Sequence, residues 1–301
     1  MESNANRKAC ILFCTFDKLF HLNHVIMIVA IVKETKTPPD RRVAVTPKTG
    51  AELARRFPEL DLQIQKSDIR CFKEEEYINA GLHVVDDISD AAILIGVKEV
   101  DIPSLIAGKT YMFFSHTAKK QPYNRKLLKA IVEKKITLID YEYLTDSNHV
   151  RLVAFGRWAG IVGAYNGLRA WGERSGDFYL KPAYECHDMD EMMAGLKPVN
   201  LPPTKILITG GGRVAHGAME TLSALNLKEV SAVDFLNSQF DEVVVCRIDP
   251  DNYVKREDEK SFDLQHFFDH PAEYDSTFYP FTKIADLLIP CHFWDPASPV
   301  L

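Results

Sequence analysis

Apolar and polar positions follow two different patterns along the chain. Short apolar runs of the kind found in buried parallel strands are separated by stretches with the 3.6-residue period of an amphipathic helix. We expect strands at 27–34, 61–65, 91–98, 110–116 and 134–142, and helices at 47–56, 74–80 and 122–133. Strands and helices that alternate at this spacing predict an open α/β sheet with right-handed crossovers.

A long helical stretch at 153–173 contains Gly160, Gly163 and Gly167. Each glycine in a helix costs about 1 kcal/mol relative to alanine. A close contact with another helix or a sheet could offset that cost, because glycine lets two backbones approach. We interpret this stretch as a helix that connects two domains and precedes a proline-containing linker.

A second strand-turn-helix pattern begins with "TKILITGGGRVAHGAMETLSAL". Gly210, Gly212 and Ala215 match G-x-G-x-x-A, between an apolar strand and a helix. A tight turn needs glycine, a pyrophosphate must approach bare backbone, and the helix N-terminus supplies amide donors. The context favours a dinucleotide-binding turn over a purely structural glycine turn.

An acidic residue about 20 positions after such a turn typically binds the adenosine ribose. Asp234 ends "KEVSAVD" and Asp249 ends "EVVVCRID". We favour Asp234, because Asp249 comes rather late. The next apolar strand, at 284–294, is expected to end near the nicotinamide side of the cofactor.

Composition narrows the classes of function. The 301 residues, 46% of them hydrophobic, suit about two domains. The net charge of −6 without a basic block argues against a nucleic acid or an anionic membrane as partner. The six cysteines are scattered without metal-ligand spacing, so we expect reduced thiols in a cytoplasmic protein and no metal site.

The first 26 residues differ in character from the rest of the chain. They are apolar, but Asp17, Lys18, His21 and His24 interrupt them well short of a membrane span. They also lack the pattern of a signal peptide. We expect an N-terminal extension at 1–26 and a first strand that begins at Met27.

Three charged residues of the first domain lie where predicted strands end. Arg42 comes after the first strand, Lys98 after "ILIGV" and His116 after "YMFFS". Ligands of open α/β sheets bind outside the carboxyl ends of the strands. A lysine beside other cations loses proton affinity and becomes a usable base, histidine titrates near neutrality, and arginine binds carboxylates. Each residue alone is more simply a solvated strand end, but together they fit hydride transfer at a carbon that bears nitrogen.

Several longer motifs point to one family. The segments "KETKTPPDRRVAVTP", "ILIGVKE", "FFSHTAKKQPYN", "RLVAFGRWAG" and "ITGGGRVAHGA" resemble the lysine-forming saccharopine dehydrogenases and the related lysine–2-oxoglutarate reductases. These enzymes belong to one superfamily with alanine dehydrogenase and the transhydrogenase nucleotide-binding subunits. The resemblance runs from about Met27 to the last residue, and "FSHTAKKQ" and "AFGRWAG" are its most specific parts.

The resemblance implies a fold of two Rossmann-like parallel-sheet domains with a cleft between them, joined by a long helix. We expect a substrate and catalytic domain at 27–152, the connecting helix and linker at 153–203, and a dinucleotide-binding domain at 204–301. Family members continue beyond "HFWDPASPVL", so we expect the C-terminal part of the family fold to be missing and the second domain to be incomplete.

The resemblance also implies a role for individual residues. Lys98 matches the general base of the family and His116 its general acid. Residues that hold the substrate are matched by Arg42, Gln121, Arg151 and Phe155. Cofactor contacts are matched by Gly212, Arg213 and Phe293, in addition to the Gly210 and Asp234 of the glycine-turn pattern. One cofactor-side arginine of the fungal enzymes, just before Arg151, is replaced by Val150.

The implied function is NAD-dependent oxidation of saccharopine to lysine and 2-oxoglutarate, or the reverse reaction. The alternatives are an NADP-linked lysine–2-oxoglutarate reductase, an alanine dehydrogenase, and an inactive nucleotide-binding homologue. Retention of Lys98, His116 and Arg42 together argues against the last. The sequence leaves the choice between NAD and NADP, the direction of reaction and the oligomeric state open.

Overall fold

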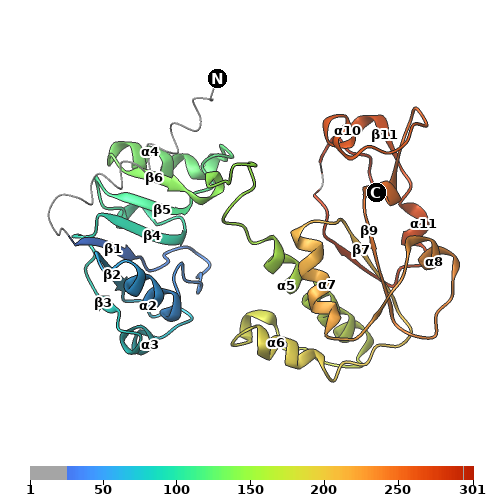
Figure 1. Cartoon of the computed structure of the whole chain (residues 1–301), viewed down its shortest axis with the longest axis horizontal. Helices are drawn as coiled ribbons and strands as arrows, with labels where there is room; N and C mark the ends of the chain where they lie inside the picture. The colour runs from blue at the N-terminus through green and yellow to red at the C-terminus, as the bar shows by residue number, and fades with distance from the viewer. Residues whose placement is uncertain (1–25, 294) are drawn as a thin grey trace. The chain divides into compact units, whose positions relative to one another are not determined.

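The computed structural model describes residues 26–293 and 295–301, which form two compact units that divide between Ala154 and Phe155 (Figure 1). The predicted extension at 1–26 lies, apart from Ile26, outside the described residues. The long helix predicted near 153–173 is α5, and it falls within the second unit.

The first unit is built on a parallel sheet of six strands in the order β3-β2-β1-β4-β5-β6. The strands are β1 (Met27–Ile31), β2 (Leu60–Gln65), β3 (His83–Val85), β4 (Ile93–Lys98), β5 (Thr110–Phe114) and β6 (Thr137–Asp140). After β1, the strands β2 and β3 are added on one side of it. The chain then crosses to the other side of β1, where β4, β5 and β6 follow in order. The neighbours β1 and β4 therefore flank the point where the strand order reverses, which is where open α/β sheets bind ligands.

Helices and turns cover both faces of this sheet. They are α2 (Pro47–Arg56), α3 (Glu74–Asn79), α4 (Arg125–Glu133) and the 3₁₀ turns η1 (Ile102–Ser104), η2 (Pro122–Asn124) and η3 (Tyr141–Tyr143). Thr46 caps α2 by accepting a hydrogen bond from the Thr49 amide, and Pro47 occupies the first helical position, where its missing N–H costs nothing. The sequence predicted all three α-helices to within about one turn.

Successive β1 residues enter different cores, as expected for a strand buried on both faces. Val29 and Ile31 pack with Ile64 and residues near α2 and α3. Ala30 packs on the other face, in a core that includes the α4 residue Leu127. This double cover fixes the carboxyl ends of β1, β4 and β5 along one edge.

The second unit has a parallel sheet in the order β12-β7-β9-β8 and a separate antiparallel pair, β10-β11. The strands are β7 (Lys205–Thr209), β8 (Lys228–Glu229), β9 (Val244–Ile248), β10 (Val254–Arg256), β11 (Tyr274–Ser276) and β12 (Leu287–Pro290). The helices and turns are α5 (Gly156–Ser175), η4 (Ala183–Glu185), α6 (Met189–Leu196), α7 (Arg213–Ser223), α8 (Ala232–Asn237), α9 (Pro250–Tyr253), α10 (Leu264–Asp269), η5 (Pro271–Glu273) and α11 (Tyr279–Thr282). Here the strand order reverses between β7 and β12.

The helices α5 and α7 cross at van der Waals distance through two glycines. A Cβ on Gly160 would lie 1.8 Å from the Val214 carbonyl oxygen, and one on Gly217 would lie 2.0 Å from the Arg157 carbonyl oxygen. The Thr221 hydroxyl of α7 donates across the same contact to the Ile161 carbonyl at 3.1 Å. The close helix contact expected from the glycines of α5 is therefore present.

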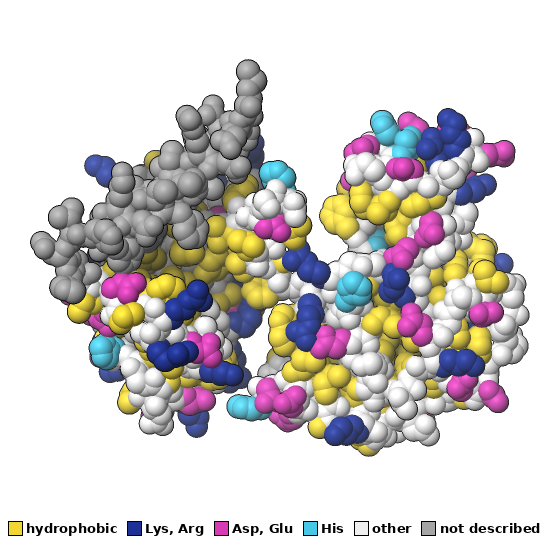
Figure 2. All heavy atoms as spheres, in the orientation of Figure 1, with side chains coloured by type: hydrophobic (Ala, Val, Ile, Leu, Met, Phe, Trp, Pro, Cys, Tyr) yellow, Lys and Arg dark blue, Asp and Glu magenta, His cyan; other side chains and the backbone are white. Residues whose placement is uncertain are grey.

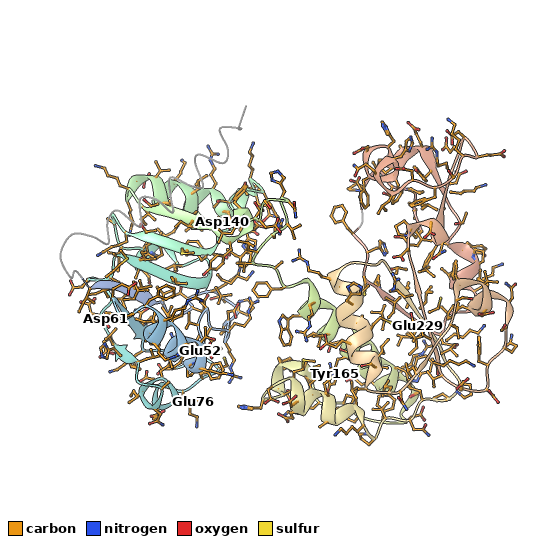
Figure 3. The ribbon with its side chains drawn as sticks, viewed as in Figure 1. Glu52, Asp61, Glu76, Asp140, Tyr165 and Glu229 are labelled. Atoms are coloured by element: carbon orange, nitrogen blue, oxygen red, sulfur yellow. The ribbon has the colours of Figure 1, made fainter. Side chains whose placement is uncertain are left out.

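The three glycines of α5 do not share one role. A Cβ on Gly163 would meet no atom within 4 Å, and one on Gly167 would make ordinary contact with Ile289 of β12. Tyr165, labelled in Figure 3, lies on the same helix, and its hydroxyl donates to the Lys181 carbonyl at 2.7 Å. Burial raises the pKa of the Tyr165 phenol to about 12, so it remains a hydrogen-bond donor at neutral pH.

The surface carries charges of both signs. Figure 2 shows Lys and Arg side chains interspersed with Asp and Glu over the described part of the visible face. Within the described ranges, no helix is both long enough and apolar enough to cross a membrane.

Candidate active site

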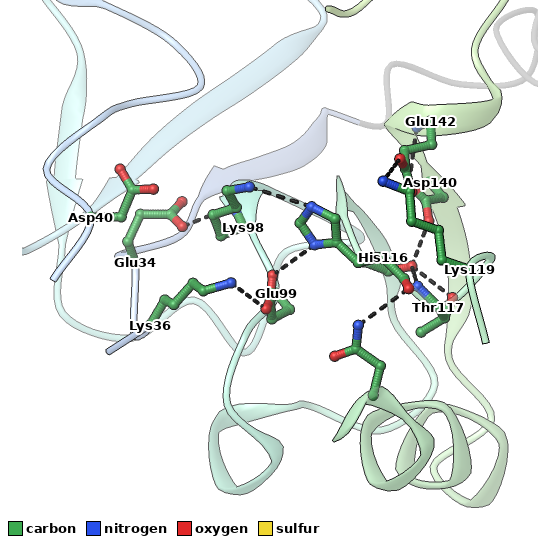
Figure 4. A network of polar contacts seen from close by, with 12 residues as sticks. Glu34, Lys36, Asp40, Lys98, Glu99, His116, Thr117, Lys119, Asp140 and Glu142 are labelled. Carbon is green, nitrogen blue, oxygen red and sulfur yellow. Dashed lines mark hydrogen bonds and ion pairs between the residues drawn. The ribbon is translucent and has the colours of Figure 1, made fainter. Parts of the chain in front are cut away.

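Side chains of the first unit gather where β1, β4 and β5 end, beside the reversal of strand order. Lys98 is the last residue of β4, and His116 lies two residues beyond β5. Lys98 Nζ is 3.4 Å from His116 Nε2 (Figure 4). The two candidate proton carriers are therefore in direct contact at this edge of the sheet.

The pKa of the Lys98 ammonium is lowered from its ordinary value of 10.5, first by burial and then by the nearby positive charges of Arg42 and Lys36. The lysine also lies over the Phe114 ring, 5.8 Å from its centroid. A lysine whose neutral form is favoured in this way can accept a proton closer to neutral pH than an exposed lysine can.

An irregularity in β4 decides which face of the sheet Lys98 occupies. Ile95 pairs with Met112 of β5, yet Lys98 pairs with Phe114, so β4 contains one extra residue. Paired residues lie on the same face, and the bulge therefore brings Lys98 to the face of Ile95.

His116 has a left-handed backbone, with φ of 53°. The Asn124 side chain donates to the His116 carbonyl at 3.2 Å, which holds this uncommon conformation in place. The imidazole stacks on Phe114 with centroids 6.3 Å apart. The strained turn thus directs the ring back toward the end of β4.

Glu99 lies on the other side of the imidazole. His116 Nδ1 is 3.4 Å from Glu99 Oε2, an ion-pair distance without hydrogen-bond geometry. Lys36 Nζ is 2.5 Å from Glu99 Oε1. Burial is the largest single influence on the Glu99 carboxyl and raises its pKa, but the hydrogen bond from Lys36, a backbone hydrogen bond and the positive charge of Lys36 together lower the pKa below its ordinary value. A charged carboxylate facing Nδ1 favours a proton there, which leaves Nε2 directed at Lys98.

Glu34, which no sequence pattern indicated, binds the backbone of β4 beside Lys98. Its two carboxylate oxygens accept from the Val97 amide at 2.7 Å and the Lys98 amide at 2.9 Å. Gly96 makes room for this approach, because a Cβ there would lie 3.3 Å from Glu34 Oε1. Burial raises the pKa of the Glu34 carboxyl against the lowering effect of these two hydrogen bonds.

Arg42 makes a forked contact with a carboxylate of its own loop. Its Nε and Nη2 donate to Asp40 Oδ1 and Oδ2 at 2.9 and 2.5 Å. This contact holds the pKa of Asp40 below its ordinary value. The pairing has the geometry with which an arginine binds a carboxylate, and Arg42 is close enough to Lys98 to lower the pKa of the lysine.

The loop that carries His116 is tied to β6. The buried Ser115 hydroxyl donates to Asp140 Oδ2 at 2.5 Å and lies 2.7 Å from the Thr117 hydroxyl. Asp140, labelled in Figure 3, is the last residue of β6. Two strand ends therefore fix the position of the histidine.

The remaining predicted substrate residues lie farther along the chain. Gln121 precedes the turn η2. Arg151 Nη1 is 3.8 Å from Glu142 Oε1, which also lies 3.5 Å from Lys119 Nζ. Phe155 precedes α5 in the second unit. Thus Lys98, His116 and Arg42 form one cluster, and Arg151 belongs to a neighbouring group around Glu142.

The glycine turn of the second unit lies between β7 and α7. Gly210 has a φ of 91°, Gly212 precedes the helix, and Arg213 is its first residue. A Cβ on Gly212 would meet nothing within 4 Å, so the backbone is open on that side. Open backbone at the start of an eleven-residue helix fits the pyrophosphate of a dinucleotide. Among the described residues, no group of three or more His, Cys, Asp or Glu side chains could hold a metal ion.

The preference for Asp234 over Asp249 is corrected by the structure. Asp234 lies in the first turn of α8, where it pairs with Ser231. Lys205, the first residue of β7, donates to the carbonyl of Phe235 at 2.8 Å, so α8 packs near the end of the strand opposite to the glycine turn. The segment "KEVSAVD" forms only the two-residue strand β8 before it becomes helical.

Asp249 is the acid that meets the turn. It comes directly after β9, the neighbour of β7 in the sheet. A Cβ on Gly211 would lie 2.6 Å from Asp249 Oδ1. The strand order, which sequence spacing does not reveal, thus makes Asp249 the candidate for the ribose.

Residues after β12 flank the turn from the other side. His292 Nδ1 is 2.6 Å from the buried Thr209 hydroxyl, and a Cβ on Gly210 would lie 3.1 Å from His292 Cα. Burial lowers the pKa of the His292 imidazole. Phe293, predicted to lie against the cofactor, comes next and is 88% exposed, so its ring is accessible for stacking.

Comparison with known proteins agrees with this geometry. The family of the alanine dehydrogenase/PNT N-terminal domain matches residues 30–162. "Alpha-aminoadipic semialdehyde synthase, mitochondrial" of Rattus norvegicus is 30% identical over 304 residues, which cover 91% of this chain and 32% of that protein. "Saccharopine dehydrogenase [NAD(+), L-lysine-forming]" of Yarrowia lipolytica is 26% identical over 216 residues, which cover 66% of this chain and 58% of that protein.

These matches support the resemblance to the saccharopine dehydrogenases, within the alanine dehydrogenase superfamily. The chain spans about a third of the length of the semialdehyde synthases that it matches. Among solved structures, an L-alanine dehydrogenase matches with a TM-score of 0.52 at 20% identity and covers 74% of this chain and 61% of that one. This likeness supports the fold of two parallel-sheet units.

Proposed function

We propose that this protein is an oxidoreductase that interconverts saccharopine with lysine and 2-oxoglutarate. The observation that carries the proposal is the contact between Lys98 Nζ and His116 Nε2 at 3.4 Å, combined with the lowered pKa of the lysine. A base and an acid in contact at the reversal of strand order suit a reaction that moves protons on nitrogen and oxygen. The semialdehyde synthase and saccharopine dehydrogenase relatives support lysine metabolism as its setting.

The glycine turn of the second unit would hold a nicotinamide dinucleotide through Gly210, Gly212 and Arg213, with Asp249 at the ribose and Phe293 at the ring. A nicotinamide held there would supply the acceptor for the hydride from the carbon of the C–N bond. The fungal relative is named as an NAD(+) enzyme, which favours NAD here, and NADP is the alternative.

Within the first unit, Lys98 in its neutral form takes the proton of the substrate nitrogen as the hydride leaves. His116 then moves protons as water adds to the resulting carbon–nitrogen double bond and the lysine amine departs. Arg42 holds a substrate carboxylate in the way that it now holds Asp40. Gln121, Arg151 and Phe155 are proposed to hold the remainder of the substrate.

The partners proposed are these small molecules, with no role for nucleic acid or a membrane. A cytoplasmic location is proposed from the scattered cysteines, of which the described ones, Cys71, Cys186, Cys246 and Cys291, are free thiols. The animal relatives are themselves named mitochondrial.

The proposal is tested by steady-state assay of the whole protein in both directions, with NAD and with NADP. Lys98→Met and His116→Gln should each lower kcat by about 10²–10⁴-fold, while the affinity for the reduced dinucleotide stays the same. Glu52→Gln on the exposed side of α2 is the matched control and should leave both unchanged. Turnover that does not depend on saccharopine or on lysine with 2-oxoglutarate would overturn the proposed function.

A further inference from the structure

Arg247 and Asp249 form an ion pair directly against the glycine turn. Arg247 lies in β9, and Asp249 comes after that strand and begins α9. A Cβ on Gly211 would lie 2.6 Å from Asp249 Oδ1 and 3.0 Å from Arg247 Nη1. Both charged groups therefore lie over the backbone of the turn, at the end of the strand next to β7.

The pair is closely held. Arg247 Nη1 donates to both Asp249 oxygens at 2.7 Å. The Asp249 side chain is the more accessible of the two, with 42% of it exposed against 30% for Arg247. In addition, the Asp249 amide donates to the Asn252 side-chain oxygen at 3.1 Å. The carboxylate is thus positioned by the backbone and faces outward, with the guanidinium secured to it.

The two side chains have opposite preferences at the adenosine ribose. A carboxylate accepts hydrogen bonds from the ribose hydroxyls of NAD and repels the 2′-phosphate of NADP, whereas an arginine near this position accommodates that phosphate. A chain with both residues at the turn contains the recognition chemistry for either cofactor. The cofactor that binds then depends on whether the Arg247 guanidinium is already paired with Asp249.

We propose that the Arg247–Asp249 pair selects the cofactor: Asp249 binds the ribose hydroxyls and withholds Arg247 from a 2′-phosphate. This inference rests on the proposed dinucleotide site at the glycine turn. Arg247 is then a specificity-determining residue whose effect is suppressed by its partner. Removal of the carboxylate alone should convert an NAD site into one that binds the 2′-phosphate form.

The test is equilibrium titration of the whole protein with NADH and with NADPH, monitored by nucleotide fluorescence. The wild type should prefer NADH. Asp249→Ser keeps a residue that can cap α9, and it should reverse the preference by weakening NADH binding and strengthening NADPH binding at least roughly tenfold, the scale of one charge-assisted hydrogen bond. Asp249→Ser combined with Arg247→Ala should lose the NADPH gain, because no guanidinium remains to bind the phosphate.

Asp251→Ser, on the exposed side of α9, is the matched control and should leave both affinities unchanged. A wild type that prefers NADPH would overturn the proposal, as would an Asp249→Ser variant that melts normally but keeps the wild-type preference. Failure of the wild type to bind either nucleotide would overturn the dinucleotide site itself. That last result differs from the others, so failure of the selecting pair and failure of the proposed function are distinguishable.

Discussion

The strands β4 and β5 of the first sheet end at titratable side chains, whereas the strand β7 of the second sheet ends at glycine backbone. At the edge of the first sheet, Lys98 contacts His116, and Glu34 accepts hydrogen bonds from the backbone of β4. At the edge of the second, Gly210 and Gly212 expose the start of α7. Proton transfer needs side chains, because only side chains titrate there. A pyrophosphate must reach backbone amide groups, so its site needs glycines without side chains.

The two units also differ in what holds them together. The helices α5 and α7 of the second unit interlock through Gly160 and Gly217. The first unit instead has its active edge fixed by polar ties such as Glu34 to the β4 backbone and Ser115 to Asp140. Stability should therefore be most sensitive to added volume in the second unit and to lost charge in the first.

The largest effect is expected from Gly160→Ala, compared with the same substitution three residues later. A methyl group on Gly160 would overlap the Val214 carbonyl, so the variant should lose about 3 kcal/mol or more of unfolding free energy. Gly163→Ala meets no atom and should gain up to about 1 kcal/mol from helix propensity. Chemical denaturation measures both, and equal stabilities would refute the interlocked crossing.

The next effect separates binding from folding in the second unit. Gly212→Val places its side chain in open space, so thermal unfolding should change little. The side chain would nevertheless occupy the approach of the pyrophosphate, and NADH binding should fall below detection in a fluorescence titration. Gly163→Ala serves as the control with normal binding. Wild-type affinity in Gly212→Val would reduce the glycine cluster to a structural turn.

A smaller effect is expected from Glu34→Gln in the first unit. The amide keeps one acceptor but turns the other atom into a donor facing an N–H, so the variant should lose about 1–3 kcal/mol of unfolding free energy. Displacement of β4 should also lower kcat more than it changes KM. Glu52→Gln, on the exposed side of α2, should do neither. Normal stability and turnover would show that Glu34 does not position Lys98.

The smallest effect is a pH dependence. The pKa of Lys98 is lowered in the folded state from its ordinary 10.5, so between the two values the unfolded chain binds more protons. Unfolding free energy should therefore rise with pH through that window. Lys98→Met should flatten this rise, whereas Lys129→Met, on the exposed side of α4, should keep it. Denaturant titrations at several alkaline pH values measure the slopes, and identical slopes would contradict the prediction.

The sequence predicted most strands and helices of the first unit, because long apolar runs and a capped helix such as α2 leave local signals. It also indicated Lys98 and His116 as candidates, since each lies where a predicted strand ends. It missed the short pair β10 and β11, whose strands have only three residues each and so show no periodicity.

Long-range partners were the other omission. Glu34 contacts Lys98 across 64 positions, and no local pattern marks such a pair. Its place three residues after β1, at the edge already singled out for Lys98 and His116, was the only available signal. Asp234 was preferred for the same reason: spacing along the chain says nothing about strand order, which places Asp249 beside the turn.

The extra residue in β4 determines which face of the sheet Lys98 lies on. Ile95 and Lys98 are three residues apart, an odd number that would place them on opposite faces of a regular strand, yet the bulge returns the lysine to the face of Ile95. A single insertion or deletion here could leave every side chain of the site intact and still turn the lysine toward the wrong face. Natural variation should therefore change the residues of this strand much more readily than it changes their number.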